Sequence, residues 1–220
     1  MKFHDRTDAG KRLAARLTAL GLADPVVLAL PRGGVPVAAE IARALAAPLD
    51  LVIVRKLGAP GQPELAVGAL VDGDPPDVVL NADVVQACEL SDAALARLVA
   101  RESLELARRR RAFGRALPVS VTGRTAILVD DGAATDASMK AAIRALKRRS
   151  PRQIVVAIPV APRETAAELA AQADRLVCLE QPAQFLALGF HYRHFPQLTD
   201  EEVIATLRPL EAPAAPDGAR

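Results

Sequence analysis

The sequence predicts an α/β domain built on a doubly wound parallel sheet, because short apolar runs alternate with stretches of helical periodicity. The apolar runs are rich in Val, Ile and Leu and contain few polar residues, which is typical of strands covered on both faces. Most of them are followed by an Ala-rich amphipathic stretch, the order found in βαβ units. We expect five core strands, at residues 26–30, 51–54, 126–129, 153–158 and 176–179.

Six helices are expected from apolar periodicity and from the residues that precede it. Ser91 stands before an acidic residue and an apolar-periodic run, and Thr199 is followed by three acidic residues. Pro162 stands just ahead of a third such run, where its fixed backbone angle suits a helix start. The expected helices are residues 8–20, 35–45, 91–113, 138–148, 163–173 and 200–207.

One domain over residues 1–208 is the expected organisation, because 220 residues with 51% hydrophobic content can bury one substantial core. Between the second and third strands lies an insertion, residues 55–123, in which we expect a flexible loop, two weaker strand candidates (65–71 and 78–80) and the long basic helix. Insertions of this length are usually functional. The tail, residues 209–220, is rich in Pro and Ala without periodicity, and we expect it to be disordered.

Charge and composition argue against several classes of partner. The formal charge is +2, and the arginine run 108–111 is embedded in a helix that also contains Glu, so we expect a solvated helix face and no nucleic acid. The N-terminus lacks the apolar core of a signal peptide, and no uncharged run approaches the roughly 20 residues that span a bilayer. A cytoplasmic protein without a membrane partner is therefore expected.

The most informative segment is TAILVDDGAATDASMKAA, residues 125–142. An apolar strand ends in Asp130 and Asp131, a loop of small residues follows, and Ser138 opens a helix. In open α/β sheets, ligands bind beyond the carboxyl ends of the strands, and the free amides of a helix N-terminus hold phosphate. The segment therefore predicts a phosphate site, the alternative being a strand that ends in a solvated acidic turn.

Two further motifs follow strands. Arg32, Gly33 and Gly34 come directly after the first strand, where glycine permits a close approach of the backbone to a ligand. Arg55 and Lys56 follow the second strand, so we expect them at the same edge of the sheet, suited to an anion. The alternatives are a plain strand-to-helix turn for the glycines and solvated surface charges for the cations.

Glu64 lies in a Gly/Pro-rich segment, where we expect it to cap a helix or pair with an arginine. Phe185, Phe190, Tyr192 and Phe195 are four of the six aromatic residues of the chain. One of them could stack on a base, and packing in the core is the alternative.

Taken together, these motifs resemble the type I phosphoribosyltransferases, and the chain from about residue 3 to residue 207 is similar to a bacterial group of unassigned acceptor. The resemblance implies a type I phosphoribosyltransferase-like sheet with a small hood or insertion. It also implies transfer of ribose 5-phosphate from phosphoribosyl pyrophosphate to a nitrogen acceptor such as a nucleobase, with release of pyrophosphate.

The resemblance further implies a role for each motif. Asp130 and Asp131 would hold the ribose hydroxyls and, mainly through substrate and water, Mg²⁺, while Arg32 and Lys56 would stabilise the leaving pyrophosphate. We expect replacement of both acids by Asn to weaken donor binding and leave the fold intact. The implied substrate-binding residues are Gly33, Gly34, Arg55, Ala133, Ala134, Thr135, Asp136, Ala137, Ser138 and, beside the base, Phe185.

Asp136 departs from the family pattern, which has glycine at this position. A carboxylate about 5 Å from a phosphate would oppose binding by roughly 1–3 kcal/mol per phosphate charge. The alternative function is therefore a regulatory protein that binds phosphoribosyl pyrophosphate or a nucleotide with little or no transfer. A receiver-type or flavodoxin-like domain would leave the other two motifs unexplained. The acceptor and the oligomeric state, a homodimer included, are left open by the sequence.

Overall fold

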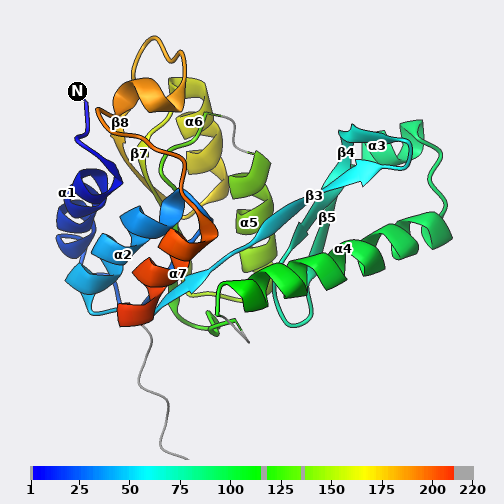
Figure 1. The fold of residues 1–220 in the computed structure, drawn as a ribbon, viewed down its shortest axis with the longest axis horizontal. Coiled ribbons are helices and arrows are strands. Elements are labelled where there is room, and N and C mark those ends of the chain that lie inside the picture. The colour runs from blue at the N-terminus through cyan, green and yellow to red at the C-terminus, as the bar shows by residue number, and fades with distance from the viewer. Residues whose placement is uncertain (1, 115–117, 135–136, 211–220) are drawn as a thin grey trace, which may run out of the picture.

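The computed structural model describes residues 2–114, 118–134 and 137–210. Its centre is a five-stranded parallel sheet with the strand order β2-β1-β6-β7-β8 (Figure 1). The sheet confirms the predicted fold class, and four of its five strands lie within two residues of their expected positions. The strands are β1 (Pro25–Ala29), β2 (Leu49–Leu51), β6 (Thr125–Val129), β7 (Gln153–Val160) and β8 (Arg175–Glu180).

Helices cover both faces of the sheet, as a doubly wound fold requires. Val27 and Ile127 face the cluster that contains the apolar residues of α1 (Arg6–Thr18) and α2 (Gly34–Leu45). Their neighbours Leu28 and Leu128 face α5 (Ala137–Arg148) and α6 (Arg163–Gln172). Because side chains alternate along a strand, this double burial explains why the strand sequences are almost continuously apolar. Against α2 packs α7 (Asp200–Leu207).

Residues 54–112 form an arm that projects from this core (Figure 1). An antiparallel sheet, in the order β3-β4-β5, lies along α4 (Asp92–Ala112), and Leu57, Leu70, Leu98 and Leu106 are buried in the cluster that joins them. Within the described residues no helix has the length and apolarity needed to cross a membrane. The remaining elements of the arm are β3 (Val54–Ala59), β4 (Gln62–Val71), β5 (Asp77–Leu80) and α3 (Ala82–Ala87).

The predicted second strand, residues 51–54, was wrong in its extent. β2 ends at Leu51, and the chain then leaves the parallel sheet to begin β3 at Val54, which pairs with Val71 of β4. The prediction missed β3 because its second half and the following turn contain Gly58, Pro60 and Gly61 and read as a loop. The hairpin turns at Gly61, whose φ of 80° suits glycine. The short helix α3 was also missed.

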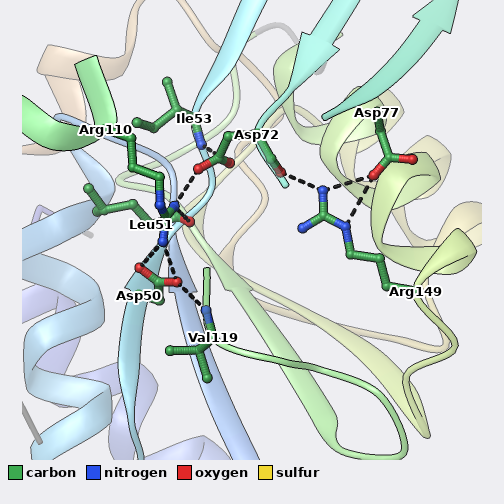
Figure 2. Close-up of polar contacts among 8 residues, drawn as sticks. All are labelled: Asp50, Leu51, Ile53, Asp72, Asp77, Arg110, Val119 and Arg149. Carbon is green, nitrogen blue, oxygen red and sulfur yellow. Dashed lines mark hydrogen bonds and ion pairs between the residues drawn. The ribbon is translucent and has the colours of Figure 1, made fainter. Parts of the chain in front are cut away.

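A buried charged network ties the arm to the core (Figure 2). Arg110 of α4 donates from Nη2 to both carboxylate oxygens of Asp50 in β2, at 2.8 and 2.7 Å. Its Nη1 pairs with Asp72, which follows β4 and accepts a 2.7 Å bond from the Ile53 amide. Arg110, Asp50 and Asp72 are each at most 5% exposed. The solvated face expected for the run 108–111 is therefore corrected at Arg110, which points inward.

Candidate active site

The loop after β1 and the acidic pair after β6 lie in contact at the carboxyl edge of the parallel sheet. The Leu30 amide donates to the Val129 carbonyl at 2.9 Å, which extends the β1–β6 ladder to the loop. A Cβ added at Gly33 would lie 2.1 Å from Asp131 Oδ2, and one at Gly34 would lie 2.6 Å from the Val129 carbonyl oxygen. The glycines are thus required by the close approach of the two segments. The peptide bond between Pro31 and Arg32 is cis.

Replacing Gly33 by alanine should displace the Asp131 side chain and cost about 1–3 kcal/mol of stability, because a methyl group has no room beside that carboxylate. Chemical denaturation would measure the loss. Gly189→Ala is the matched control, since a Cβ there meets only Phe195 at an ordinary 3.5 Å. Equal free energies of unfolding for both variants would mean that the Asp131 side chain moves aside without loss of stability.

Asp131 is held on three sides. Its Oδ2 accepts a 2.7 Å hydrogen bond from Nε of Arg6, which lies at the start of α1. Its carbonyl oxygen accepts a 2.6 Å bond from the Tyr192 hydroxyl, and its own amide donates to Oδ1 of Asp130 at 2.8 Å. Asp131 is 7% exposed, whereas Asp130 keeps partial exposure. The two acids predicted as equivalent ligands therefore occupy different environments.

Burial dominates the electrostatics of the acidic pair. It raises the pKa of Asp130 well above its ordinary value, and the negative charge of Asp131 raises it further. Burial also raises the pKa of Asp131, while the hydrogen bond and charge of Arg6 oppose that rise. A ligand that brings hydroxyl donors or positive charge would stabilise the ionised form of these two neighbouring carboxyls.

A cavity of about 340 Å³ opens beside the pair. The predicted residues Arg32 and Gly33 line it together with Asp131, and Arg6 adds a second guanidinium. The Arg32 side chain is about one-third exposed and lies 3.5 Å from the Asp200 carboxylate. The cavity therefore joins Asp131, the second member of the acidic pair, with an accessible cation. Its remaining lining residues are Phe195, Pro196, Gln197 and Leu198.

The predicted phosphate loop is described in part. The buried Ala133 donates its amide to the Val160 carbonyl at 3.0 Å, so this N–H is already used within the protein. Ala134 is exposed, and so are Ala137 and Ser138 in the first turn of α5. A helix N-terminus of this kind favours the binding of an anion. Thr135 and Asp136 lie outside the described residues.

Arg55 and Lys56 are not brought to Arg32 in this structure. Both lie in β3 and line a separate cavity of about 810 Å³ between the arm sheet and α4. Arg55 donates to Glu102 at 2.6 Å, and Lys56 pairs with Glu64 at 2.9 Å. The expected pairing of Glu64 is thus made with a lysine.

The C-terminal segment, residues 185–198, covers the end of β6. Phe185 stacks on the imidazole of His191 with ring centroids 4.9 Å apart and packs beside a small aromatic cluster. A Cβ at Gly132 would lie 2.3 Å from Leu188, so the segment presses on the backbone directly after the acidic pair. Phe185, which the resemblance placed beside the base, lies within this covering segment and is not among the residues that line the cavity beside Asp131.

Sequence reasoning missed Arg6 and Tyr192 as members of the site. Arg6 reads as one of several charges on an amphipathic surface helix, yet it is 9% exposed. Its contact with Asp131 joins residues 125 positions apart, which no local pattern reveals. Tyr192 was noted only as a member of an aromatic group.

Asp130 and Asp131 supply only part of the set of oxygen ligands that Mg²⁺ requires. Mg²⁺ prefers oxygen ligands and usually keeps several waters, with one or two carboxylates from the protein. The structure supplies two carboxyls, one of them already paired with Arg6, and among residues 2–114, 118–134 and 137–210 no cluster of three or more potential ligands occurs. These residues fit an ion held mainly by substrate and water.

Comparison with known proteins gives consistent matches. A model described as the phosphoribosyl transferase domain matches residues 3–193. Two proteins from strains CDC 1551 and H37Rv of Mycobacterium tuberculosis, each named "Putative phosphoribosyl transferase", are 48% identical over 206 residues. The match covers 93% of this chain and 46% of each relative, so the chain spans about half the length of these curated relatives. The crystal structure of TT1426 from Thermus thermophilus is 43% identical, with a TM-score of 0.83 over 96% of this chain and 100% of that one.

Proposed function

Because the chain belongs to the phosphoribosyl transferase family, we propose that it transfers ribose 5-phosphate from phosphoribosyl pyrophosphate to a nitrogen acceptor, a nucleobase, with release of pyrophosphate. The observation that carries the proposal is the contact between the acidic pair and the Arg32–Gly33–Gly34 loop at the carboxyl edge of the sheet. This contact places groups suited to ribose hydroxyls beside a cation suited to pyrophosphate.

The protein would contribute mainly position and charge. Asp131, which lines the cavity, and its neighbour Asp130 would accept hydrogen bonds from the ribose hydroxyls. Arg32 would neutralise the leaving pyrophosphate, and the first turn of α5, with Ala137 and Ser138 exposed, would hold the 5-phosphate. Lys56 and Arg55 would reach the pyrophosphate only after movement of the arm or from another molecule, so the leaving group is assigned to Arg32.

Magnesium would be held at Asp130 through substrate and water, and when bound it would offset the negative charge of the pyrophosphate. The other roles in the transfer would be carried out by residues of the chain. The C-terminal segment that covers the end of β6 would limit the access of water to the ribose carbon, where positive charge develops during transfer.

Asp130→Asn is expected to weaken binding of phosphoribosyl pyrophosphate about 10- to 100-fold, because hydrogen bonds to a charged acceptor are worth about 1.5–3 kcal/mol. Calorimetric titration in the presence of Mg²⁺ would measure it. Asp83→Asn, at an exposed position of α3, removes an equal charge far from the cavity and should bind normally. Unchanged affinity of the Asp130 variant would remove this residue from the donor site.

Asp130→Asn should also raise the melting temperature at neutral pH. The folded-state pKa of Asp130 lies above its unfolded value, so the ionised carboxylate destabilises the fold above that raised pKa. This cost is relieved as the pH falls through the raised pKa toward 3.8, the ordinary value. The advantage of the Asn variant should therefore shrink across that window in thermal melts.

The test of transfer itself is release of pyrophosphate from phosphoribosyl pyrophosphate and Mg²⁺ in a screen of purine and pyrimidine bases. Release with one base and not with the others would identify the acceptor. Tight donor binding without release for any base would support the alternative of a regulatory protein with the same fold. Absence of donor binding would contradict both.

A further inference from the structure

Arg32, the accessible cation of the cavity beside Asp131, faces a carboxylate from the C-terminal helix. Its Nη1 lies 3.5 Å from Oδ1 of Asp200, the first residue of α7. This distance is longer than the roughly 2.7–3.2 Å of an N–H···O hydrogen bond. The guanidinium is therefore attracted to Asp200 without being fixed by it, and its N–H groups remain available to a ligand in the cavity that Arg32 lines.

The packing of α7 holds Asp200 at this position. Val203, one turn further along, is 1% exposed and belongs to the apolar cluster that contains α2, the helix that follows the glycine loop. The start of α7 is fixed by a capping box: the Glu202 amide donates to the Thr199 hydroxyl at 3.2 Å, and the Thr199 amide donates to the Glu202 carboxylate at 2.8 Å. The carboxylate of Asp200 is thus presented to the loop by a well-anchored helix end.

The charge of Asp200 is not compensated by hydrogen bonds. Its Oδ1 is buried and has no hydrogen-bond partner among the described residues. Asp200 is absent from the lining of the cavity beside Asp131, so it would act on a ligand across the Arg32 guanidinium, by charge and not by contact. Because the side chain as a whole is 46% exposed, water screens this charge and the effective dielectric constant is close to that of the solvent.

The size of the effect depends on the charge of the ligand. An anionic oxygen bound to Arg32 at about 3 Å would lie about 7 Å from the Asp200 carboxylate. At an effective dielectric constant of about 80, repulsion over this distance lowers affinity about threefold for each unit of negative charge on the ligand. Since Mg²⁺ removes two such units from pyrophosphate, Asp200 would disfavour the metal-free anion about tenfold relative to its magnesium complex.

We propose that Asp200 is a specificity-determining residue of the donor site, whose charge beside Arg32 makes the site prefer the magnesium complex of pyrophosphate to the metal-free anion. This inference rests on the proposed function, in which Arg32 meets the pyrophosphate group, and deepens it. It gives Asp200 a role toward the ligand in addition to its place at the start of a helix.

The test is calorimetric titration of the parent protein and Asp200→Asn with pyrophosphate at low ionic strength, once with Mg²⁺ and once with a chelator of divalent ions. We expect the ratio of the two dissociation constants, metal-free over magnesium complex, to fall about tenfold in the variant. The ratio is the decisive quantity, because loss of a merely structural contact to Arg32 would weaken both forms of the ligand alike.

Asp92→Asn is the matched control. Asp92 is exposed at the first position of α4, directly after the N-cap Ser91, so this change removes the same charge from the same position of a helix in the arm. It should leave the ratio at the parental value. Asp200→Glu keeps the charge and should restore most of the parental ratio. Asp200→Ser is a second neutral variant, with the same expected ratio as Asp200→Asn, for use if the latter does not fold.

Two results would overturn the inference while leaving the proposed function standing: a parental ratio in the neutral Asp200 variants, or an equally large shift in Asp200→Glu. Failure of the parent protein to bind pyrophosphate in either form, or phosphoribosyl pyrophosphate with Mg²⁺, would instead overturn the proposed function and this inference with it. Titration of the parent protein therefore distinguishes the two failures.

Discussion

Replacing Arg110 by methionine is expected to lower the free energy of unfolding by about 3–5 kcal/mol, since removal of one partner leaves buried charges uncompensated. Arg110 is 5% exposed and contacts Asp50 and Asp72, which are 2% and 3% exposed. Because these acids lie in β2 and after β4, the loss should also loosen the arm from the core (Figure 2). Denaturant unfolding monitored by circular dichroism would measure the change.

Arg108→Met is the control for this experiment. Arg108 lies on the same helix and pairs with Glu105, but its side chain is 71% exposed, so the cost should stay within about 0.5 kcal/mol. Lowering the pH should reduce the difference in unfolding free energy between Arg110→Met and Arg108→Met. Burial raises the pKa of Asp72, and without Arg110 that pKa rises further, so protonation relieves the unpaired charge as the pH falls toward 4. Equal losses in the two variants would show that the network adds nothing to stability.

Asp131→Asn is expected to cost a similar 3–5 kcal/mol, although Asp130→Asn should leave the fold intact or stabilise it. The difference follows from Arg6, which is 9% exposed and whose guanidinium would lose its only carboxylate partner among the described residues. The expectation from sequence, that both acids could be replaced without effect on the fold, is thereby revised for Asp131.

A double-mutant cycle separates the ion pair from other effects of the substitution. Arg6→Gln combined with Asp131→Asn removes both charges and leaves two neutral amides, so it should recover part of the stability lost by Asp131→Asn alone. Melting curves of the four proteins would give the coupling energy. Strictly additive losses would mean that Arg6 and Asp131 do not depend on one another in the folded state.

The parallel sheet was predictable because its signal is local. Each core strand is buried on both faces, so its residues are apolar in sequence, and each following helix has a clear apolar stripe. The arm was harder to predict. β3 is half-exposed, contains Gly58 and is bounded by a Gly/Pro turn, so neither its periodicity nor its composition marks a strand. Its identity as a strand comes from pairing with β4, which is a tertiary fact.

The residues of the candidate site that directly follow core strands were predictable for the same reason. Arg32, Gly33, Asp130 and Asp131 follow strands directly, so the topology brings them to one edge of the sheet. Arg55 also follows a predicted strand, but the chain leaves the parallel sheet before it, which separates it from the others. Arg6 and Tyr192 join the site from the two ends of the domain, and only the folded chain shows them there.

Tyr192 gives this protein a built-in optical reporter, because the chain contains one tyrosine and no tryptophan. Its ring is 4% exposed and stacks on Phe195 with centroids 4.7 Å apart, and its hydroxyl is bonded to the backbone of Asp131. All tyrosine emission of the chain therefore originates beside the acidic pair, and its intensity should respond to occupation of the cavity without any label. Burial raises the pKa of the phenol. Tyrosinate absorption in alkaline solution should consequently appear only when the structure around Tyr192 unfolds locally.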